Sequence, residues 1–385
     1  MEISDGYLEP VKNNDKGKTS LYQSAQIANN IQYFLSSSQD TNNFSGLKIA
    51  LLGVPEDRSS ANYGCAKAPD LIRNELYRLF CPFNMPGIID MGNLKSGISV
   101  NDTYVALRDV TKTLLSNGLI PVILGGSQDL TYALFLALEQ LKHSVNITCI
   151  DSRIDIGDSR REMNSVSYIS RIVLEKSNRL FNFSNIGSQN YLVSQDEMKL
   201  MEKLYFDSYR LGSTHSDIFS IEPVLRDTDL LSLDIGSVRQ SEAPAQSKPS
   251  PNGFYAEEVC QFARFAGLSN RCNVFGLFEV NPDYDNQNLT ISLAAQIIWH
   301  FIEGVSERKK DSSKSECTRY IVKVEEIKQE ITFYRCNKTN RWWIEIPYKQ
   351  DLEEKAITIS CSYKDYKMTC KGDIPDRLWR VYQKL

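Results

Sequence analysis

The stretch LKIALLGVPEDRSSANYGCAKAPDLIRNELYRLF, residues 47–80, decides the fold class. Residues 47–55 form an apolar run that ends at a glycine and a proline, which is typical of a strand buried on both faces of a sheet. In residues 68–80 the apolar side chains recur at helical spacing, and Pro69 stands near the start, where a helix tolerates proline. The stretch therefore predicts a buried strand, a loop and an amphipathic helix.

The same alternation continues through most of the chain. It predicts strands at residues 87–92, 119–126, 145–151, 179–187, 230–236 and 272–280, and helices at 102–118, 129–141, 254–267 and 290–305. Strands that alternate with helices on this scale predict an α/β fold with a mostly parallel, doubly wound sheet and helices on both faces. In such a fold the functional loops gather at the carboxyl ends of the strands.

The two ends of the chain depart from this pattern. Residues 1–46 are polar, and residues 20–37 within them predict one helix. Residues 306–316 contain no apolar side chain, so we expect residues 306–317 to form a linker or exposed loop after an α/β domain of residues 47–305. Residues 319–348 alternate with period two around CNKTNR, which predicts a β-hairpin. It belongs to a small β-rich module of residues 318–385 that holds three of the four tryptophans.

Composition argues against several classes of protein. Of the 385 residues, 42% are hydrophobic and 24% are charged, as in soluble globular proteins, and a net charge of −4 gives no electrostatic reason to bind nucleic acid or an anionic membrane. The polar start does not look like a signal peptide, and no apolar run approaches the roughly 18 residues of a bilayer span. Nine cysteines without a C-x-x-C pair favour free thiols in a reducing cytoplasm.

Polar residues stand at the ends of four predicted strands. The sequence GGSQ (125–128) ends one strand and DSRID (151–155) ends another, while Asp234 and Glu279 end two more. Because the carboxyl ends of parallel strands share one edge of a sheet, these side chains are expected to converge on one cleft.

These motifs, in this order, resemble those of the ureohydrolases, which include arginase, agmatinase and formimidoylglutamase, and the formimidoylglutamase-like branch fits best. The segments LLGVPEDRSSANYGCAKAPDLIRNELY, DMGNL, EVNP and TISLAAQII carry the resemblance further, and it covers roughly residues 47–305. The resemblance implies a three-layer α/β/α fold, a homo-oligomer, and two Mn²⁺ ions whose bridging hydroxide attacks the guanidinium or formimino carbon of a small substrate.

The resemblance fails at three expected metal ligands. Gln128 stands in place of the histidine of a Gly-Gly-x-His motif, Arg153 in place of the histidine of Asp-x-His-x-Asp, and Gly236 in place of the second aspartate of Ser-x-Asp-x-Asp. Three of the six expected ligands remain, and these are Asp151, Asp155 and Asp234. The remaining carboxylates belong mainly to one metal position, where Gln128 would be a weak oxygen donor.

Arg153 suggests how the lost metal charge is replaced. Two carboxylates about 4 Å apart repel by roughly 4 kcal/mol at an effective dielectric constant of 20, so three of them need a cation or a proton. We expect the Arg153 guanidinium to bridge two of the aspartates in place of the second metal, without generating hydroxide. Two alternatives stay open: one metal ion still binds, or Arg153 points to solvent while the aspartates bind loop amides.

Three functions follow from these alternatives. The first is a non-hydrolytic pseudoenzyme with a structural or ligand-binding role, with no cofactor or at most one manganese ion. The second is a single-metal hydrolase of a guanidino or formimino substrate, and the third is an interaction protein that works through its aromatic C-terminal module. By resemblance Glu279 would approach the ligand nitrogen, and Asn164 and Ser165 would meet its carboxylate or amino group unless they only form a turn.

Overall fold

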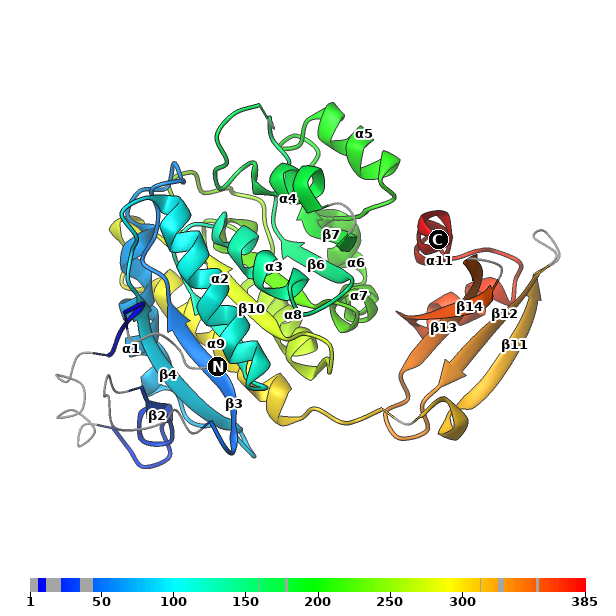
Figure 1. Cartoon of the computed structure of the whole chain (residues 1–385), viewed down its shortest axis with the longest axis horizontal. Helices are drawn as coiled ribbons and strands as arrows, with labels where there is room; N and C mark the ends of the chain where they lie inside the picture. The colour runs from blue at the N-terminus through cyan, green and yellow to red at the C-terminus, as the bar shows by residue number, and fades with distance from the viewer. Residues whose placement is uncertain are drawn as a thin grey trace.

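The largest element of the protein is a ten-stranded sheet (Figure 1). The computed structural model describes residues 6–11, 22–34, 44–158, 160–176, 179–311, 313–324, 329–350 and 353–385. The strand order is β1-β4-β3-β5-β10-β9-β6-β7-β8, and β2 pairs with β4 outside this path.

Seven strands lie where the sequence predicts them. They are β3 (Leu47–Gly53), β4 (Gly87–Leu94), β5 (Ile120–Leu124), β6 (Val145–Ile150), β7 (Leu180–Ser188), β9 (Leu230–Asp234) and β10 (Val274–Phe278). The short edge strand β8 (Asp207–Arg210) was not predicted. Apart from β1 (Leu8–Glu9), which is antiparallel to β4, the paired strands of this sheet are parallel. The prediction of a mostly parallel sheet is confirmed.

The last two strands of this sheet in chain order, β9 and β10, lie in its middle. β9 and β10 insert between β5 and β6, so β5, β10, β9 and β6 are consecutive neighbours. In-register pairs such as Leu277 with Leu124 and Leu233 with Ile150 align their carboxyl ends. Segments separated by more than a hundred residues therefore end side by side.

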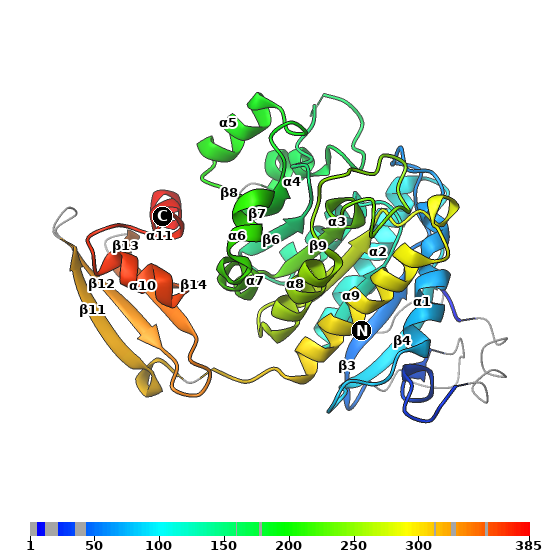
Figure 2. The same cartoon turned by 180° about the vertical axis from the view of Figure 1, so that it is seen from behind.

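Helices cover both faces of the sheet (Figure 2). The helices α1 (Ala68–Arg78), α8 (Ala256–Leu268) and α9 (Leu289–Ser306) pack on one face with residues such as Leu51. The helices α2 (Val100–Ser116), α3 (Leu130–Glu139) and α4 (Tyr168–Lys176) pack on the other face with Leu52. Successive residues of a strand point to opposite faces, so the apolar run of β3 is buried from both sides. This arrangement confirms the three layers.

Helix α9 is a core helix that is also long and apolar enough to cross a membrane. Its mean hydropathy is 1.2 over 18 residues, and 61% of it is buried inside the fold. It packs closely against α8, because a Cβ atom at Gly304 would lie 2.5 Å from the Arg264 carbonyl oxygen. Because most of α9 is buried inside the fold, its apolar composition is that of a core helix.

The predicted N-terminal helix is wrong for the residues described there. Residues 22–34 contain a short 3₁₀ helix, Ile27–Asn29, and the strand β2 (Gln32–Tyr33), while the rest of residues 20–37 lies outside the described ranges. The Asn29 and Asn30 side chains donate to backbone carbonyls of residues 22–26, and β2 pairs with β4. These contacts compete with helical hydrogen bonds and replace them.

A separate antiparallel sheet forms the C-terminal module. Its strands are β11 (Thr318–Val324), β12 (Gln329–Arg335), β13 (Trp342–Gln350) and β14 (Glu353–Cys361). The hairpin of β12 and β13 around residues 336–341 is confirmed. Two helices follow, α10 (Tyr363–Thr369) and α11 (Asp376–Lys384), which the period-two pattern did not indicate. The module has its own apolar core, which includes Phe333, Ile344 and Ile346.

Two of the three tryptophans of this module are used inside the protein. Trp342 stacks on Tyr320 and Tyr366, and Arg226 of the α/β domain lies 4.9 Å from the ring centroid of Trp343. Trp379 is 49% exposed. The tryptophan content therefore reflects packing more than a free aromatic surface.

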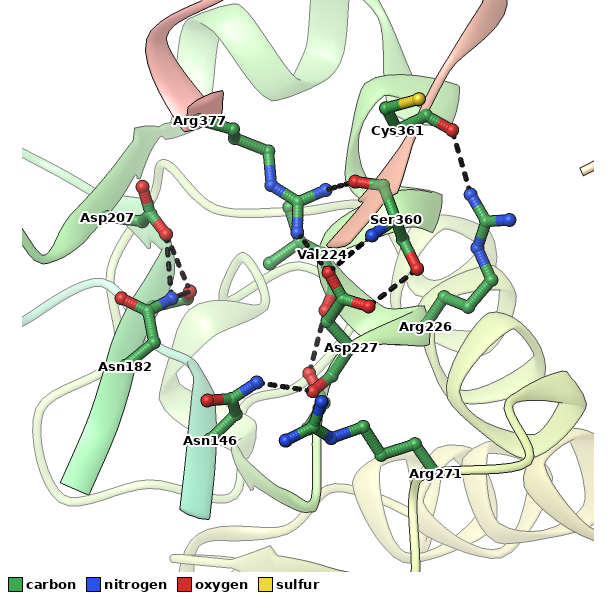
Figure 3. Close-up of polar contacts among 12 residues, drawn as sticks. Asn146, Asn182, Asp207, Val224, Arg226, Asp227, Arg271, Ser360, Cys361 and Arg377 are labelled. Carbon is green, nitrogen blue, oxygen red and sulfur yellow. Dashed lines mark hydrogen bonds and ion pairs between the residues drawn. The ribbon is translucent and has the colours of Figure 1, made fainter. Parts of the chain in front are cut away.

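Asp227 joins the C-terminal module to the α/β domain (Figure 3). Its carboxylate accepts hydrogen bonds from the Ser360 amide at 2.9 Å, the Ser360 hydroxyl at 2.6 Å and Arg377 Nη2 at 2.9 Å. Beside it, Arg226 Nη2 donates to the Cys361 carbonyl oxygen at 2.9 Å. Asp227 precedes β9, so the module docks at the amino ends of the strands, opposite the edge where the sequence predicts a site.

Replacing Asp227 with alanine is expected to loosen this junction. The change removes a charge-assisted bond and two further acceptor contacts, which together contribute roughly 2 kcal/mol to the free energy of unfolding. We expect a lower midpoint in denaturant unfolding and faster proteolysis near residues 306–317. Asp373→Ala, at an exposed position of the same module, is the control, and equal behaviour of the two variants would contradict the assignment.

Candidate functional site

A cavity of about 600 Å³ opens at the carboxyl ends of the four central strands. Gln128 follows β5, Glu279 follows β10, Asp234 ends β9, and Asp151 follows β6. The ends of these four strands therefore lie together, as the sequence predicts. The cavity wall includes Ser60, Asn62, Arg153, Asp155, Ser165, Tyr191, Asp234, Gly236, Lys248 and Glu279.

The three aspartates form one electrostatic group. Asp151 and Asp155 are buried, and Asp234 is partly buried at the cavity wall. Burial raises the pKa of Asp151, and burial together with the charge of Asp151 raises the pKa values of Asp155 and Asp234 well above the ordinary range. Burial and mutual repulsion therefore favour protonation within this group, which relieves part of the repulsion.

The amide of Gln128 relieves another part. When its nitrogen faces the carboxylates, both ends of the amide have complementary partners: Nε2 donates to Asp151 Oδ2 at 2.9 Å and to Asp155 Oδ2 at 3.2 Å. The oxygen then accepts a hydrogen bond from the Tyr168 hydroxyl at 3.2 Å. Gln128 therefore presents donors to the aspartates, whereas a metal ligand would present a lone pair.

Tyr168 is a contact of the Gln128 amide that the sequence did not reveal. It is fully buried at the start of α4, and its hydroxyl also lies 3.2 Å from Cys149 Sγ, on β6. Its bond to the Gln128 oxygen favours the orientation in which the amide nitrogen faces the aspartates. No motif marks Tyr168 in the sequence, because its position depends on how α4 packs against β6.

Arg153 does not form the predicted bidentate ion pair. Its side chain is exposed at the mouth of the cavity, and its guanidinium makes no ion pair with the aspartates within the described part of the chain. Its backbone amide instead donates to Asp151 Oδ1 at 2.8 Å, and its charge opposes the rise in the pKa of Asp151 that burial causes.

Gly236 also contributes through its backbone. Its amide donates to Asp234 Oδ1 at 2.6 Å. A Cβ atom at this position would lie 3.0 Å from the same oxygen and 3.2 Å from Gln246 Oε1. The site is therefore closely packed where the resemblance implies an additional carboxylate, and an aspartate at 236 would require its neighbours to move.

Glu279 forms a second acidic centre in the cavity. Its Oε1 accepts from the Gln128 backbone amide at 2.9 Å, and its Oε2 accepts from Asn62 Nδ2 and Ser60 Oγ, each at 3.1 Å. Burial raises the pKa of Glu279 to about 7. The Ser165 hydroxyl donates to Ser60 Oγ at 3.2 Å and so extends this network along the wall.

Asn164 has a local role. Its Oδ1 accepts from the Val166 amide at 3.0 Å and from Ser167 Oγ at 3.1 Å, which is the turn chemistry that the sequence left open. Ser165 faces the cavity and Asn164 shapes the loop that carries it. Of this predicted pair, the structure places Ser165 alone at the cavity wall.

Two of the acidic residues are held in a left-handed backbone conformation. The φ angle is +55° at Asp155 and +63° at Glu279, a region that residues other than glycine seldom adopt. Such conformations cost of order 1–3 kcal/mol each and persist where the surrounding structure enforces them. Both residues line the cavity, so this edge of the sheet is the candidate functional region.

Comparison with known proteins agrees with the fold and the strand-end motifs. The model of the arginase family matches residues 47–303. The chain belongs to the arginase family. Formimidoylglutamase of Staphylococcus haemolyticus is 24% identical over 66% of this chain and 85% of its own length, and that of Clostridium tetani is 25% identical over 70% and 87%.

Solved structures share the arginase-family fold. Formimidoylglutamase from Bacillus subtilis superposes with a TM-score of 0.66 at 21% identity, covering 74% of this chain and 93% of that protein. Formiminoglutamase of Trypanosoma cruzi, solved with Mn²⁺, superposes with a TM-score of 0.64 at 19% identity, covering 70% and 97%. These structures establish the likeness of fold.

The residues of this cavity do not fit the pair of manganese ions that the arginase-family resemblance implies. Among the described residues, no three His, Cys, Asp or Glu side chains are grouped so that they could hold a metal ion. With its nitrogen turned to the carboxyl groups, the Gln128 amide has hydrogen-bond partners in Asp151 and Asp155, and Gly236 offers only an amide donor. The histidines are engaged elsewhere, with His215 bonded to Glu258 and His300 to a helix carbonyl. Use of Asp151, Asp155, Asp234 and Gln128 for a single ion stays a prediction.

Replacing Gln128 with histidine is expected to increase manganese binding. The change removes the two amide donors that occupy the Asp151 and Asp155 oxygens and supplies a nitrogen lone pair. Metal content after incubation with Mn²⁺ and desalting, together with the Mn²⁺-dependent rise in melting temperature, measures the effect. Gln140→His adds a histidine just beyond the other end of α3 and is the control. If both variants bind equal manganese, Gln128 has no special position.

The raised pKa of Glu279 predicts a pH-dependent stability. A carboxyl group whose pKa rises from 4.5 to about 7 on folding holds its proton more tightly in the folded state. Its contribution to stability is therefore complete below about pH 4.5 and declines as the pH rises to 7, by up to about 3 kcal/mol.

Glu279→Gln mimics the protonated carboxyl group. We expect similar free energies of unfolding for the variant and the original protein at pH 5, and a more stable variant at pH 8. Denaturant unfolding at both pH values measures this difference. Glu257→Gln, at an exposed site on α8, is expected to show no such change. A constant difference across the two pH values would contradict the assignment.

Proposed function

We propose that this arginase-family protein binds a small guanidino or formimino compound in its cavity without hydrolysing it. The observation that carries this proposal is the Gln128 amide, which donates to Asp151 and Asp155 where a metal ligand would be needed. The chain keeps the cavity and its acidic wall while it differs at three residues that the resemblance assigns to metal binding.

The chemistry of the donor set supports the absence of hydrolysis. Two metal ions produce hydroxide near neutral pH and stabilise the charge that develops on the attacked centre. At this site the raised pKa values of the aspartates favour their protonated forms, and the Gln128 amide and the Gly236 amide supply hydrogen-bond donors to the carboxyl groups instead. None of these groups has an open coordination position at which water would become acidic.

The distribution of charge supports binding. The carboxyl groups of Asp155, Asp234 and Glu279 line the wall, and the basic side chains of Arg153 and Lys248 also line the cavity. A planar, cationic nitrogen group of a ligand would face the carboxyl groups, while a ligand carboxylate would face Arg153. The volume of about 600 Å³ is ample for a molecule the size of an amino acid.

The alternative is a single-metal hydrolase. It is favoured by the survival of Asp151, Asp155 and Asp234 together, since carboxylate oxygens suit manganese. Under either function the ligand is a small molecule. A cytoplasmic homo-oligomer without nucleic-acid or membrane partners remains part of the proposal, and light scattering after gel filtration would test the assembly.

Metal content and turnover separate these two functions. We expect about zero manganese per chain after incubation with Mn²⁺ and desalting, and no release of urea or ammonia from arginine, agmatine or formiminoglutamate. Gln128→Ala/Asp151→Asn is the background control for turnover. About one manganese per chain with turnover above that control would favour the hydrolase and end the proposal.

Arginine and agmatine form a matched pair of probes for binding, because agmatine lacks the α-carboxylate. If Arg153 holds a ligand carboxylate, Arg153→Ala is expected to weaken arginine binding about tenfold, or about 1.4 kcal/mol, and to leave agmatine binding unchanged. Isothermal titration calorimetry measures both. No binding of arginine, agmatine or formiminoglutamate to the original protein would contradict the ligand class.

A further inference from the structure

Cys317 and Cys336 are in contact at the base of the β11–β12 hairpin. The last paired residues of the two strands are Thr318 and Arg335, so Cys317 and Cys336 are the next cross-strand pair. The Cys317 thiol is hydrogen-bonded to the Cys336 side chain. Both cysteines are reduced, and they lie far apart in a sequence that has no C-x-x-C motif.

The backbone register is compatible with a disulfide between the two cysteines. The Cys317 amide donates to the Lys314 carbonyl oxygen and the Cys336 amide to the Arg341 carbonyl oxygen, so neither amide bonds across the pair. Facing residues that do not exchange backbone hydrogen bonds have Cα atoms about 4.5 Å apart in antiparallel sheets, and disulfides span about 4.4–6.8 Å. The two thiols therefore need no large movement of the strands to join.

The Asn337 side chain holds the pair in register. Its Nδ2 donates to the Glu316 carbonyl oxygen at 2.9 Å, and its Oδ1 accepts from Thr318 Oγ1 at 2.8 Å. These two bonds bracket Cys317 on both sides in the sequence. Because Asn337 directly follows Cys336, the same contacts fix both cysteines.

The pair lies where the C-terminal module meets the α/β domain. The turn that begins at Cys336 continues to Arg341, whose Nη2 donates to the Leu268 carbonyl oxygen at 3.1 Å. In the same turn Thr339 Oγ1 donates to Asp311 Oδ1 at 2.8 Å, in the segment that connects the two parts. A covalent bond here would fix the segment that enters the module to the turn that contacts the α/β domain.

We propose that Cys317 and Cys336 form a reversible disulfide when the protein meets a peroxide, and that this bond locks the junction of the C-terminal module. Cys317 is partly exposed and Cys336 is buried, so the peroxide oxidises Cys317 first. The Cys317 thiolate attacks one peroxide oxygen, giving a sulfenic acid and hydroxide, which a proton converts to water. The Cys336 thiol then displaces the sulfenic oxygen as a second water and completes the S–S bond.

Overall, two thiols and one hydrogen peroxide give one disulfide and two waters. Burial and the neighbouring side chains raise the pKa of Cys317, so the first step is slow at neutral pH compared with an activated thiol. A thiol reductant reverses the bond by exchange. The pair is thus suited to sustained oxidation rather than to rapid peroxide removal.

Mass spectrometry of the full-length protein tests this inference. After hydrogen peroxide treatment, the remaining thiols are blocked and the protein is digested without reduction. We expect a peptide linked through Cys317 and Cys336 that disappears with dithiothreitol. Cys370→Ser, which removes an exposed cysteine of the same module, should leave the linked peptide unchanged, and Cys317→Ser should abolish it.

Stability provides the second readout. The oxidised protein is expected to melt a few degrees higher and to resist proteolysis at the junction, and Cys317→Ser should show neither gain after the same treatment. Over-oxidation of Cys317 without a link, or a link of Cys317 to Cys370, would overturn the proposal. A linked peptide without any change in proteolysis or melting would overturn the locking role.

Discussion

Three carboxyl groups buried at one edge of a sheet repel one another unless something supplies positive charge, hydrogen-bond donors or protons. The repulsion among fully ionised aspartates is of the same order as the stability of a whole domain. This protein meets the constraint with small, local groups: the Gln128 amide, the backbone amides of Arg153 and Gly236, and protonation that the raised pKa values of the aspartates favour. Each group is tied to a strand end, so the solution depends on the whole sheet.

Topology is what makes this constraint unavoidable. β9 and β10 enter the sheet between β5 and β6, so their terminal carboxyl groups are brought beside those of the earlier strands whatever the local sequence prefers. Asp155 and Glu279, both at positive φ, follow strands of this central group and line the cavity. The proposed cationic ligand would face this acidic wall.

Hydrophobic periodicity and residue spacing predicted most helices and strands well. They predicted individual side-chain contacts much less well. The strands of the α/β domain followed from apolar runs, and their convergence followed from the rule for parallel sheets. Arg153 was expected to face the aspartates, but its side chain is exposed. Residue spacing alone does not show which way a loop turns a side chain. Gln128 was expected as an oxygen donor to a metal ion, and this stays a prediction, whereas its contact with Tyr168 from another helix could not be read from spacing. The N-terminal helix failed because pairing with β4 outweighs local propensity.

The C-terminal module and the cavity occupy opposite edges of the sheet, and this separation limits how one influences the other. Asp227 and the disulfide-forming pair act near the amino ends of the strands, whereas Asp234 acts only seven residues beyond Asp227, at the other end of β9. A change at the junction therefore reaches the cavity through the position of β9 rather than by direct contact. Because β9 is paired in register on both sides, small shifts of this strand are resisted, and the junction is expected to alter stability more than ligand affinity.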